Sequence, residues 1–211
     1  YFPNLFINRT RRDLGIINNY RTHIELVDPH EWQESHYSYN PIKVKGPGSI
    51  NQINKVIEII RKHKGQKGLI YINKHAIREW VVECLEREGI RVASIHGKMG
   101  SKTHELRADI FEGFAKGEYD VLTTSVTTGL NLDSDYIIFV EFCTDIKQMM
   151  GRAERGLNPK TLDLYFIFTR KTGEIDFFLK HIYQRSLSIQ EVLRKDYSTL
   201  IKVGAELSTM Q

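Results

Sequence analysis

Two arginines three residues apart are the first side chains in this sequence whose type and spacing could do chemistry. Arg152 and Arg155 belong to the run QMMGRAER at residues 148–155. Residues three apart on a helix lie on neighbouring positions of one face. A guanidinium group is planar, permanently charged and able to donate two parallel hydrogen bonds, so a pair of them suits a triphosphate. The alternative for this run is a solvated helix face of arginine and glutamate.

A hydroxyl-rich segment is the second candidate. Residues 120–133, DVLTTSVTTGLNLD, begin as a buried strand and continue into a loop that holds threonines, a serine and Gly129. Hydroxyl and backbone amide groups at the end of a strand can bind phosphate oxygens, and glycine lets a ligand approach the backbone closely. The alternative is a threonine-rich turn that leads into a helix.

The run GKMGSKT at residues 97–103 looks like a phosphate-binding loop but lacks the spacing of one. The Walker A pattern needs Gly directly before Lys, so that the backbone can wrap around the phosphates, and Ser101 stands in that place. No acidic pair follows a strand where Mg²⁺ would be bound. Cys84 and Cys143 lie far apart with no CxxC spacing, which argues against zinc. The sequence therefore predicts no metal site of its own.

Alternating helices and strands over residues 49–168 must position these runs. Apolar residues at helical spacing predict amphipathic helices that begin near Ser49, Ile77 and Thr103, each ended by a glycine, at positions 65, 89 and 117. The expected strands are 21–27, 69–72, 92–95, 121–124, 136–142 and 162–168. This alternation predicts an α/β fold with a parallel sheet covered on both faces. Ligands of such folds bind outside the carboxyl ends of the strands.

Finer expectations concern the later helices. Four apolar residues of the third helix are expected to face inward: Leu106, Ile110, Phe111 and Phe114. After residue 168 we expect helices over 174–185 and 188–203. Ser188 and Glu191 have the spacing of a capping box, which places the start of the last helix at Ser188.

The composition describes a globular domain. Hydrophobic residues make up 41% and charged residues 27% of the 211 residues, and the net charge of +4 is compatible with nucleic acid. No apolar run approaches the roughly 18 residues of a membrane span, and no signal peptide opens the chain. We therefore expect an intracellular protein (cytoplasmic, or in the host cytoplasm if viral), with buried thiols and no membrane partner. The opening residues, YFP, read as a boundary inside a longer protein.

Taken together, the candidate runs resemble the motifs of the second RecA-like lobe of superfamily 2 helicases and translocases. Residues 120–133 are similar to motif V of that family, and residues 148–155 are similar to motif VI, commonly written QxxGRxxR. Residues 68–75 lie where motif IV falls, and SIHG at 94–97 matches a strand followed by His-Gly. Order and spacing agree over about residues 49–170. The resemblance implies a RecA-like three-layer domain with a mostly parallel central sheet and helices on both faces.

Residues 6–14, FINRTRRDL, look like the lead-in to lobe two of Swi/Snf-type translocases. That family has an arginine pair before the threonine, and Asn8 replaces the first arginine here. The Leu-Pro expected soon afterwards is missing, and RAERGLN stands where the family has RAHRIGQ. These departures indicate a divergent archaeal or viral member. We expect a linker over 1–48 that joins lobe one to lobe two, a helicase C-terminal domain over 49–173 and a helical extension over 174–211.

The resemblance also implies roles for individual residues. In such motors ATP is bound between two lobes, and the first lobe supplies the phosphate loop and the Mg²⁺ ligands. Arg152 and Arg155 would be arginine fingers that stabilise charge on the transferred phosphoryl group. Three further residues would approach the nucleotide: Gln148, Gly129 and Asn131. The residues expected to contact the nucleic-acid backbone all lie in or after strands: Asn73, Lys74, His96, Gly97, Lys98, Thr124 and Ser125.

The expected partners are the first lobe of the same protein and nucleic acid, DNA rather than RNA. The isolated chain should then be inactive as an ATPase. One competing class is a lobe that binds nucleic acid or a partner protein without turnover, and the intact arginine pair argues against it. The other is an unrelated nucleotide-dependent α/β enzyme, such as a glycosyltransferase-like domain. That class would need a GxGxxG turn or an acidic sugar-nucleotide site, and this sequence has neither.

Overall fold

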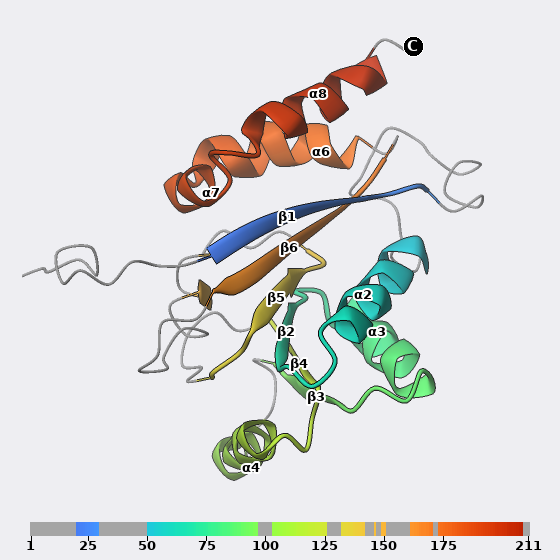
Figure 1. The fold of residues 1–211 in the computed structure, drawn as a ribbon, viewed down its shortest axis with the longest axis vertical. Coiled ribbons are helices and arrows are strands. Elements are labelled where there is room, and N and C mark those ends of the chain that lie inside the picture. Colours follow the sequence, from blue (N-terminus) through green and yellow to red (C-terminus); the bar gives the residue numbers. More distant parts are fainter. Residues whose placement is uncertain are drawn as a thin grey trace, which may run out of the picture.

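Six parallel strands form one sheet in the computed structural model of the chain. The structure describes residues 20–29, 50–96, 103–125, 132–141, 146, 149–150, 161–170 and 173–208. The strands are β1 (Tyr20–Val27), β2 (Gly68–Tyr71), β3 (Val92–Ile95), β4 (Val121–Thr124), β5 (Tyr136–Phe139) and β6 (Leu162–Thr169). Their order across the sheet is β1-β6-β5-β2-β4-β3, and every neighbouring pair is parallel (Figure 1). The carboxyl ends of all six strands therefore lie along one edge.

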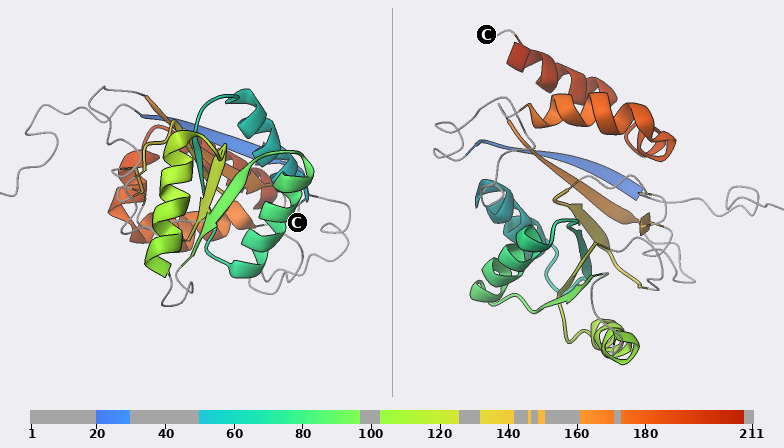
Figure 2. Two further views of the ribbon diagram at one scale, coloured as in Figure 1. Left: turned by 90° about the horizontal axis from the view of Figure 1, so that it is seen from below. Right: turned by 180° about the vertical axis from the view of Figure 1, so that it is seen from behind.

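Helices cover both faces of this sheet (Figures 1 and 2). Helices α2 (Ile50–Lys62) and α3 (His75–Arg87) lie on one face, and α4 (Thr103–Lys116) lies on the other. The C-terminal segment packs against β1 and β6 on the same face as α4 and consists of α6 (Glu174–Phe177), η1 (Phe178–Ile182), η2 (Tyr183–Arg185), α7 (Leu187–Val192) and α8 (Tyr197–Ser208). The three-layer α/β fold expected from the sequence is confirmed.

The side chains of β6 pack into two different apolar clusters, one on each face of the sheet. Leu164, Phe166 and Phe168 belong to the apolar cluster that includes α4 and the C-terminal helices. Tyr165 and Ile167, which alternate with them, belong to the cluster that includes α2 and α3. Successive side chains of a strand point to opposite faces, so a strand covered on both sides is apolar along its central run, here residues 164–168. Every residue of β6 is buried.

Glycines end the three helices of the central unit, as the sequence predicts. Gly65, Gly89 and Gly117 have φ angles of 83°, 73° and 80°. A β-carbon is disfavoured in this left-handed region, so glycine there turns the chain out of each helix towards the next strand.

Three finer expectations are wrong. Leu106 does not face inward from α4 but is 49% exposed, whereas Phe114 on the same helix is fully buried. The cap of α7 is Ser186 rather than Ser188, because the Ser186 hydroxyl accepts the hydrogen bond from the backbone N–H of Ile189. The strand expected over 136–142 ends at Phe139, and the chain bends at residues 140 and 141.

The C-terminal helices are also shorter than predicted. The segment 174–185 begins as one α-helical turn, widens into the π-helical η1 and tightens into the 3₁₀ turn η2. The segment 188–203 divides at residues 193–196 into α7 and α8. Packing explains the division, because Leu193 and Leu200 are both fully buried in the same cluster as Phe178. A single straight helix would present its apolar residues along one stripe. Two separate helices let Leu193 and Leu200 enter the same core from different directions.

A polar network joins the amino ends of β1, β5 and β6. Arg21 donates two hydrogen bonds to the Asp163 carboxylate, at 3.0 and 3.1 Å, and His23 Nε2 lies 2.8 Å from the same group. His63, just after α2, stacks on Tyr136 at 4.4 Å and is hydrogen-bonded to the hydroxyl of Tyr165 at 2.7 Å. These contacts fix the register between the edge strand β1 and the rest of the sheet.

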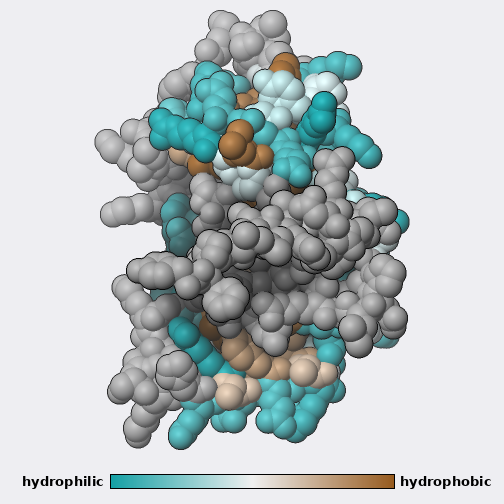
Figure 3. Space-filling model, turned by 90° about the vertical axis from the view of Figure 1, so that its left-hand side faces the viewer, coloured by the Kyte–Doolittle hydropathy of each residue, from teal (hydrophilic) through white to brown (hydrophobic). Residues whose placement is uncertain are grey.

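Most of the described surface is hydrophilic on the side drawn in Figure 3, where apolar side chains show as small groups. Among the described residues, the large apolar side chains that are exposed are spread over four helices, α2, α4, α7 and α8: Ile50, Leu106, Leu187, Tyr197 and Ile201. In the part of the chain that the structure describes, no helix has the length and apolar character needed to cross a membrane.

Candidate functional site

Three neighbouring strands bring the predicted nucleic-acid contacts to one stretch of the sheet edge. Asn73 and Lys74 follow β2, Ser125 follows β4, and His96 follows β3. Because β2, β4 and β3 are adjacent and parallel, these residues lie side by side at the carboxyl edge. Sequence positions from 73 to 125 thus converge on one surface, which is where ligands of open α/β sheets bind.

The hydroxyl residues of β4 differ in exposure. Thr124 is the last residue of the strand and is fully buried, whereas Ser125 is half-buried in the turn that follows. The backbone carbonyl of Thr124 accepts a hydrogen bond from the N–H of Ile72, 2.9 Å away, which joins the ends of β2 and β4. Ser125 is therefore the better placed of the two for a ligand above the edge.

A carboxylate holds the turn after β2. The Glu141 side chain, beyond the end of β5, accepts a hydrogen bond from the backbone N–H of Lys74 at 2.6 Å. The same carboxylate lies 3.6 Å from the Lys74 ammonium group. This contact orders the turn that precedes α3. The Lys74 side chain is 70% exposed, so it can reach a second anion.

His96 lies between basic groups from both faces of the sheet. Its backbone carbonyl accepts a hydrogen bond from Arg107 of α4, at 3.1 Å. Its ring lies 5.1 Å from the ring of His75, at the start of α3. Burial, and then the positive charge of Arg78 and the nearby His75, lower the pKa of His96. The ring is therefore neutral near pH 7.

Arg78 is the most deeply buried charged group at this edge. It is 3% exposed, and its Nη1 donates a long hydrogen bond of 3.5 Å to the carbonyl of Ile72. Burial lowers the pKa of Arg78, and the charges of Glu79 and Glu141 act against that shift. A guanidinium group nevertheless keeps its charge at any physiological pH.

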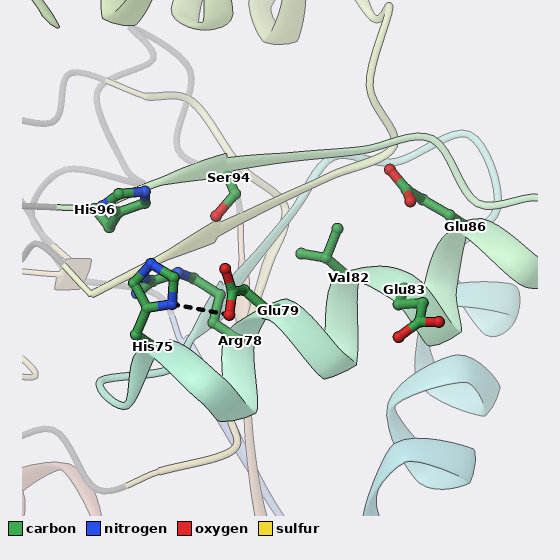
Figure 4. A pocket seen from close by; sticks show the side chains of 8 residues that line it. All are labelled: His75, Arg78, Glu79, Val82, Glu83, Glu86, Ser94 and His96. Atoms are coloured by element: carbon green, nitrogen blue, oxygen red, sulfur yellow. Dashed lines mark ion pairs between the residues drawn. The ribbon is translucent and has the colours of Figure 1, made fainter. Parts of the chain in front are cut away.

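A pocket of about 290 Å³ lies between α3 and β3 (Figure 4). Its lining residues come from one stripe of α3 and from alternate residues around β3: His75, Arg78, Glu79, Val82, Glu83, Glu86, Ser94 and His96. The basic side chains gather at the end nearest the carboxyl edge, and the last glutamates lie at the other end (Figure 4). The pocket therefore has a positive end at the candidate nucleic-acid edge.

The other predicted site residues lie outside the described residues. They are the proposed nucleotide contacts Gln148, Gly129, Asn131, Arg152 and Arg155, and the backbone contacts Gly97 and Lys98. Met149 and Met150, near the start of the arginine run, are described residues and are buried in the core cluster that includes residues of β5 and β6. Their burial explains the apolar pair within the run.

Metal binding has no candidate among the described residues. No group of three or more His, Cys, Asp or Glu side chains in the described ranges is arranged to hold an ion. Cys84 is a free, partly buried thiol packed against the α2–α3 cluster. Burial, the largest influence, raises its pKa, so this thiol suits packing better than nucleophilic chemistry.

Sequence reasoning missed Arg78, Arg107 and Glu141. A signal for Arg78 was present, because it lies three and seven residues before Val81 and Leu85 on the buried face of α3. A charged residue at a core position of an amphipathic helix predicts a special role. Arg107 and Glu141 carry no comparable signal, since their partners are distant in the chain.

Comparison with known proteins agrees with this arrangement. The family model described as the helicase conserved C-terminal domain matches residues 51–158. A putative ATP-dependent DNA helicase Q1 of Caenorhabditis elegans is 28% identical over 131 residues, which cover 58% of this chain and 20% of that protein. An ATP-dependent RNA helicase DBP2 of Encephalitozoon cuniculi is 26% identical over 109 residues, or 49% of this chain and 21% of that protein.

A solved structure shares the fold. The yeast DEAD-box splicing factor Prp28 superposes with a TM-score of 0.56 over 84% of this chain and 37% of that one, at 13% identity. The chain spans about a fifth of the length of the two curated relatives. It therefore corresponds to one part of proteins of that kind.

Proposed function

Because the chain belongs to the helicase conserved C-terminal domain family, we propose that it is the second motor lobe of an ATP-dependent nucleic-acid helicase or translocase. The observation that carries this proposal is the carboxyl edge of β2, β4 and β3. That edge gathers polar and basic groups from the three loops and from helix α3: Asn73, Lys74, Ser125, His96 and Arg78. Such an edge suits a phosphate backbone, which needs positive charge and hydrogen-bond donors but no base-specific contacts.

The proposed role in ATP hydrolysis belongs to the arginine run. Arg152 and Arg155 would reach across the interface to a nucleotide held by a first lobe, with Gln148, Gly129 and Asn131 beside it. Planar guanidinium groups suit the charge that develops on a transferred phosphoryl group. In this arrangement the Mg²⁺ ligands would come from the first lobe, together with the phosphate loop.

We infer that the nucleic acid is DNA and that the motor is of the Swi/Snf type, from the lead-in FINRTRRDL at residues 6–14. Residues 1–48 would be the linker between lobes, residues 49–173 the motor lobe and residues 174–211 an appended helical unit. Gly97, Lys98 and Thr124 would act with Asn73, Lys74, His96 and Ser125 in holding the backbone. A motor that moves along DNA must bind it without reading the sequence, which backbone contacts achieve.

The test is ATP hydrolysis by the full-length protein that contains this chain. Arg155→Ala should leave ATP binding nearly intact and reduce nucleic-acid-stimulated turnover by about 10³-fold, because an arginine finger acts in the transition state. Arg155→Lys should restore little, since an ammonium group cannot reproduce two parallel hydrogen bonds. The matched control is Arg185→Ala, at an exposed arginine of η2.

Two results would contradict the proposal. Near-normal turnover of Arg155→Ala in the presence of DNA would remove the arginine finger. DNA binding without any nucleic-acid-stimulated ATPase activity in the wild type would favour a binding lobe that has no catalytic role. Running DNA and RNA of one sequence in parallel decides which polymer stimulates turnover.

A further inference from the structure

Arg78, the buried basic group beside His96, has no ion-pair partner among the described residues, although Glu79 and Glu141 are near enough to influence its charge. Arg78 is almost completely buried, yet the described structure places no carboxylate within ion-pair distance of it. Its single described acceptor is the Ile72 carbonyl, at the long distance of 3.5 Å. A buried guanidinium group without a partner is costly, because it has lost water and gained no anion. This edge is therefore built to receive a negative charge.

His96 adds a second uncompensated group. Its Nδ1 is buried and has no hydrogen-bond partner in the described part of the chain. The charged groups that face it are Arg78, His75 and Glu79 from α3 and Arg107 from α4. Burial and the three basic groups disfavour a proton on the ring, and Glu79 only partly offsets them. An anion placed beside Arg78 and His96 would reverse that balance.

We propose that Arg78 and His96, with His75 beside them, bind one phosphate group of the nucleic-acid backbone, and that His96 takes up a proton from solvent as the phosphate enters. This inference rests on the proposed nucleic-acid function and adds regulation by pH to it. The phosphate would occupy the basic end of the pocket between α3 and β3, where His75 and His96 lie close together (Figure 4).

The rest of the pocket supports this placement. The amino end of α3 lies there with no side-chain cap, so its positive dipole end adds to the attraction. His75, whose ring pairs with Glu79 at 3.1 Å, would exchange that carboxylate for the phosphate. Glu83 and Glu86, further along the helix, repel an anion and confine it to the end near the sheet edge.

Proton uptake makes the affinity depend on pH in a defined direction. The free protein holds His96 neutral, and the bound phosphate raises its pKa, so the complex carries the extra proton. Binding must then tighten as pH falls. One linked proton allows at most about a tenfold change per pH unit, and we expect roughly three- to tenfold tighter binding near pH 6 than near pH 8.

The test is fluorescence anisotropy of the 211-residue chain with a labelled poly(dT) strand at both pH values and constant ionic strength. Wild type should show the tightening, and His96→Gln should bind with nearly equal affinity at both pH values. Arg78→Gln should weaken binding at both. His181→Gln, at an exposed histidine of η1, should behave as wild type. A pH-dependent difference that survives in His96→Gln would overturn the proposal.

An NMR titration of the His96 ring separates this proposal from the nucleic-acid function. Inorganic phosphate, compared with chloride at the same ionic strength, should raise the measured pKa of His96 in wild type but not in Arg78→Gln. In Arg78→Gln the pKa of free His96 should already be higher than in wild type. A His96 pKa that phosphate leaves unchanged would overturn the phosphate site, even where poly(dT) binds. Loss of poly(dT) binding with the phosphate response intact would instead overturn the nucleic-acid function.

Discussion

Gly68→Ala is expected to destabilise the fold more than an added methyl group usually does. Gly68 opens β2, which pairs with β4 on one side and β5 on the other. A β-carbon there would lie closer than 3.0 Å to Cζ and Oη of Tyr136. The Tyr136 ring is fully buried and stacks on His63, so it has no free side to move towards.

The magnitude follows from two opposing effects. Overpacking a filled core costs about 1–3 kcal/mol, and the upper part of that range applies where neither ring nor backbone can shift. Alanine also restricts the unfolded chain, which stabilises the fold by about 0.4–1 kcal/mol. The net loss should be about 2 kcal/mol, which lowers the midpoint of thermal unfolding by roughly 4–8 °C in a domain of this size.

Urea unfolding followed by circular dichroism measures this loss. The control is Gly204→Ala in α8, where the nearest atom to an added β-carbon, Asp176 Oδ1, lies 3.2 Å away. That change should be neutral or stabilising, because alanine favours a helix over glycine by about 1 kcal/mol. The double variant Gly68→Ala/Tyr136→Ala should cost less than the sum of its two parts, since the cavity receives the methyl group. Strict additivity, or a wild-type midpoint for Gly68→Ala, would refute the packing argument.

Three further predictions concern stability, pH and activity. Burial raises the pKa of Glu174 to about 7, above the value of 4.5 for an ordinary glutamate, so stability should fall as pH rises from about 4.5 to 7. Glu174→Gln, which can still accept the hydrogen bond from the Thr169 N–H, should flatten that slope in urea titrations across pH; an unchanged slope would assign it to other groups. Asp163→Asn should cost about 1–3 kcal/mol by weakening the bonds to Arg21 and His23, and a wild-type urea midpoint would show that these bonds contribute little. The isolated chain should fold yet hydrolyse no ATP when DNA is added, and an Arg155-dependent rate in this fragment would show that it is a whole enzyme.

The central sheet was predictable because its signals are local. Short apolar runs, helical spacing and a glycine after each helix each lie within a few residues, and β3 and β4 match the expected bounds. The C-terminal helices were predicted less well. Helical spacing over 174–203 records only which residues are apolar, whereas the π-helical turn at Phe178–Ile182 and the break at residues 193–196 depend on how those residues meet the sheet.

In the candidate site too, features set by local sequence were predictable and contacts between distant residues were not. The loops after β2, β3 and β4 were predictable, because parallel strands bring their carboxyl ends to one edge. The contact between Glu141 and Lys74 was not, since it joins residues 67 positions apart. Leu106 illustrates the opposite error. It lies at helical spacing from Ile110, but α4 meets the sheet along a narrow stripe and Leu106 falls outside it.

The buried Asp163 at the amino edge of the sheet has charged partners within the chain, whereas the buried Arg78 at its carboxyl edge has none among the described residues, and this contrast supports the assignment of the site. At the amino ends, the Asp163 carboxylate has two basic partners, and the hydrogen bonds from His23 and Arg21 outweigh the effect of burial and lower its pKa. At the carboxyl ends, Arg78 is buried without an ion-pair partner among the described residues, and the Nδ1 atom of the partly buried His96 has no described hydrogen-bond partner. The amino-end groups can be explained by folding alone, because their partners lie within the chain. The carboxyl-end groups cost stability until an anion arrives, so their arrangement makes sense in a protein that binds phosphate at this edge.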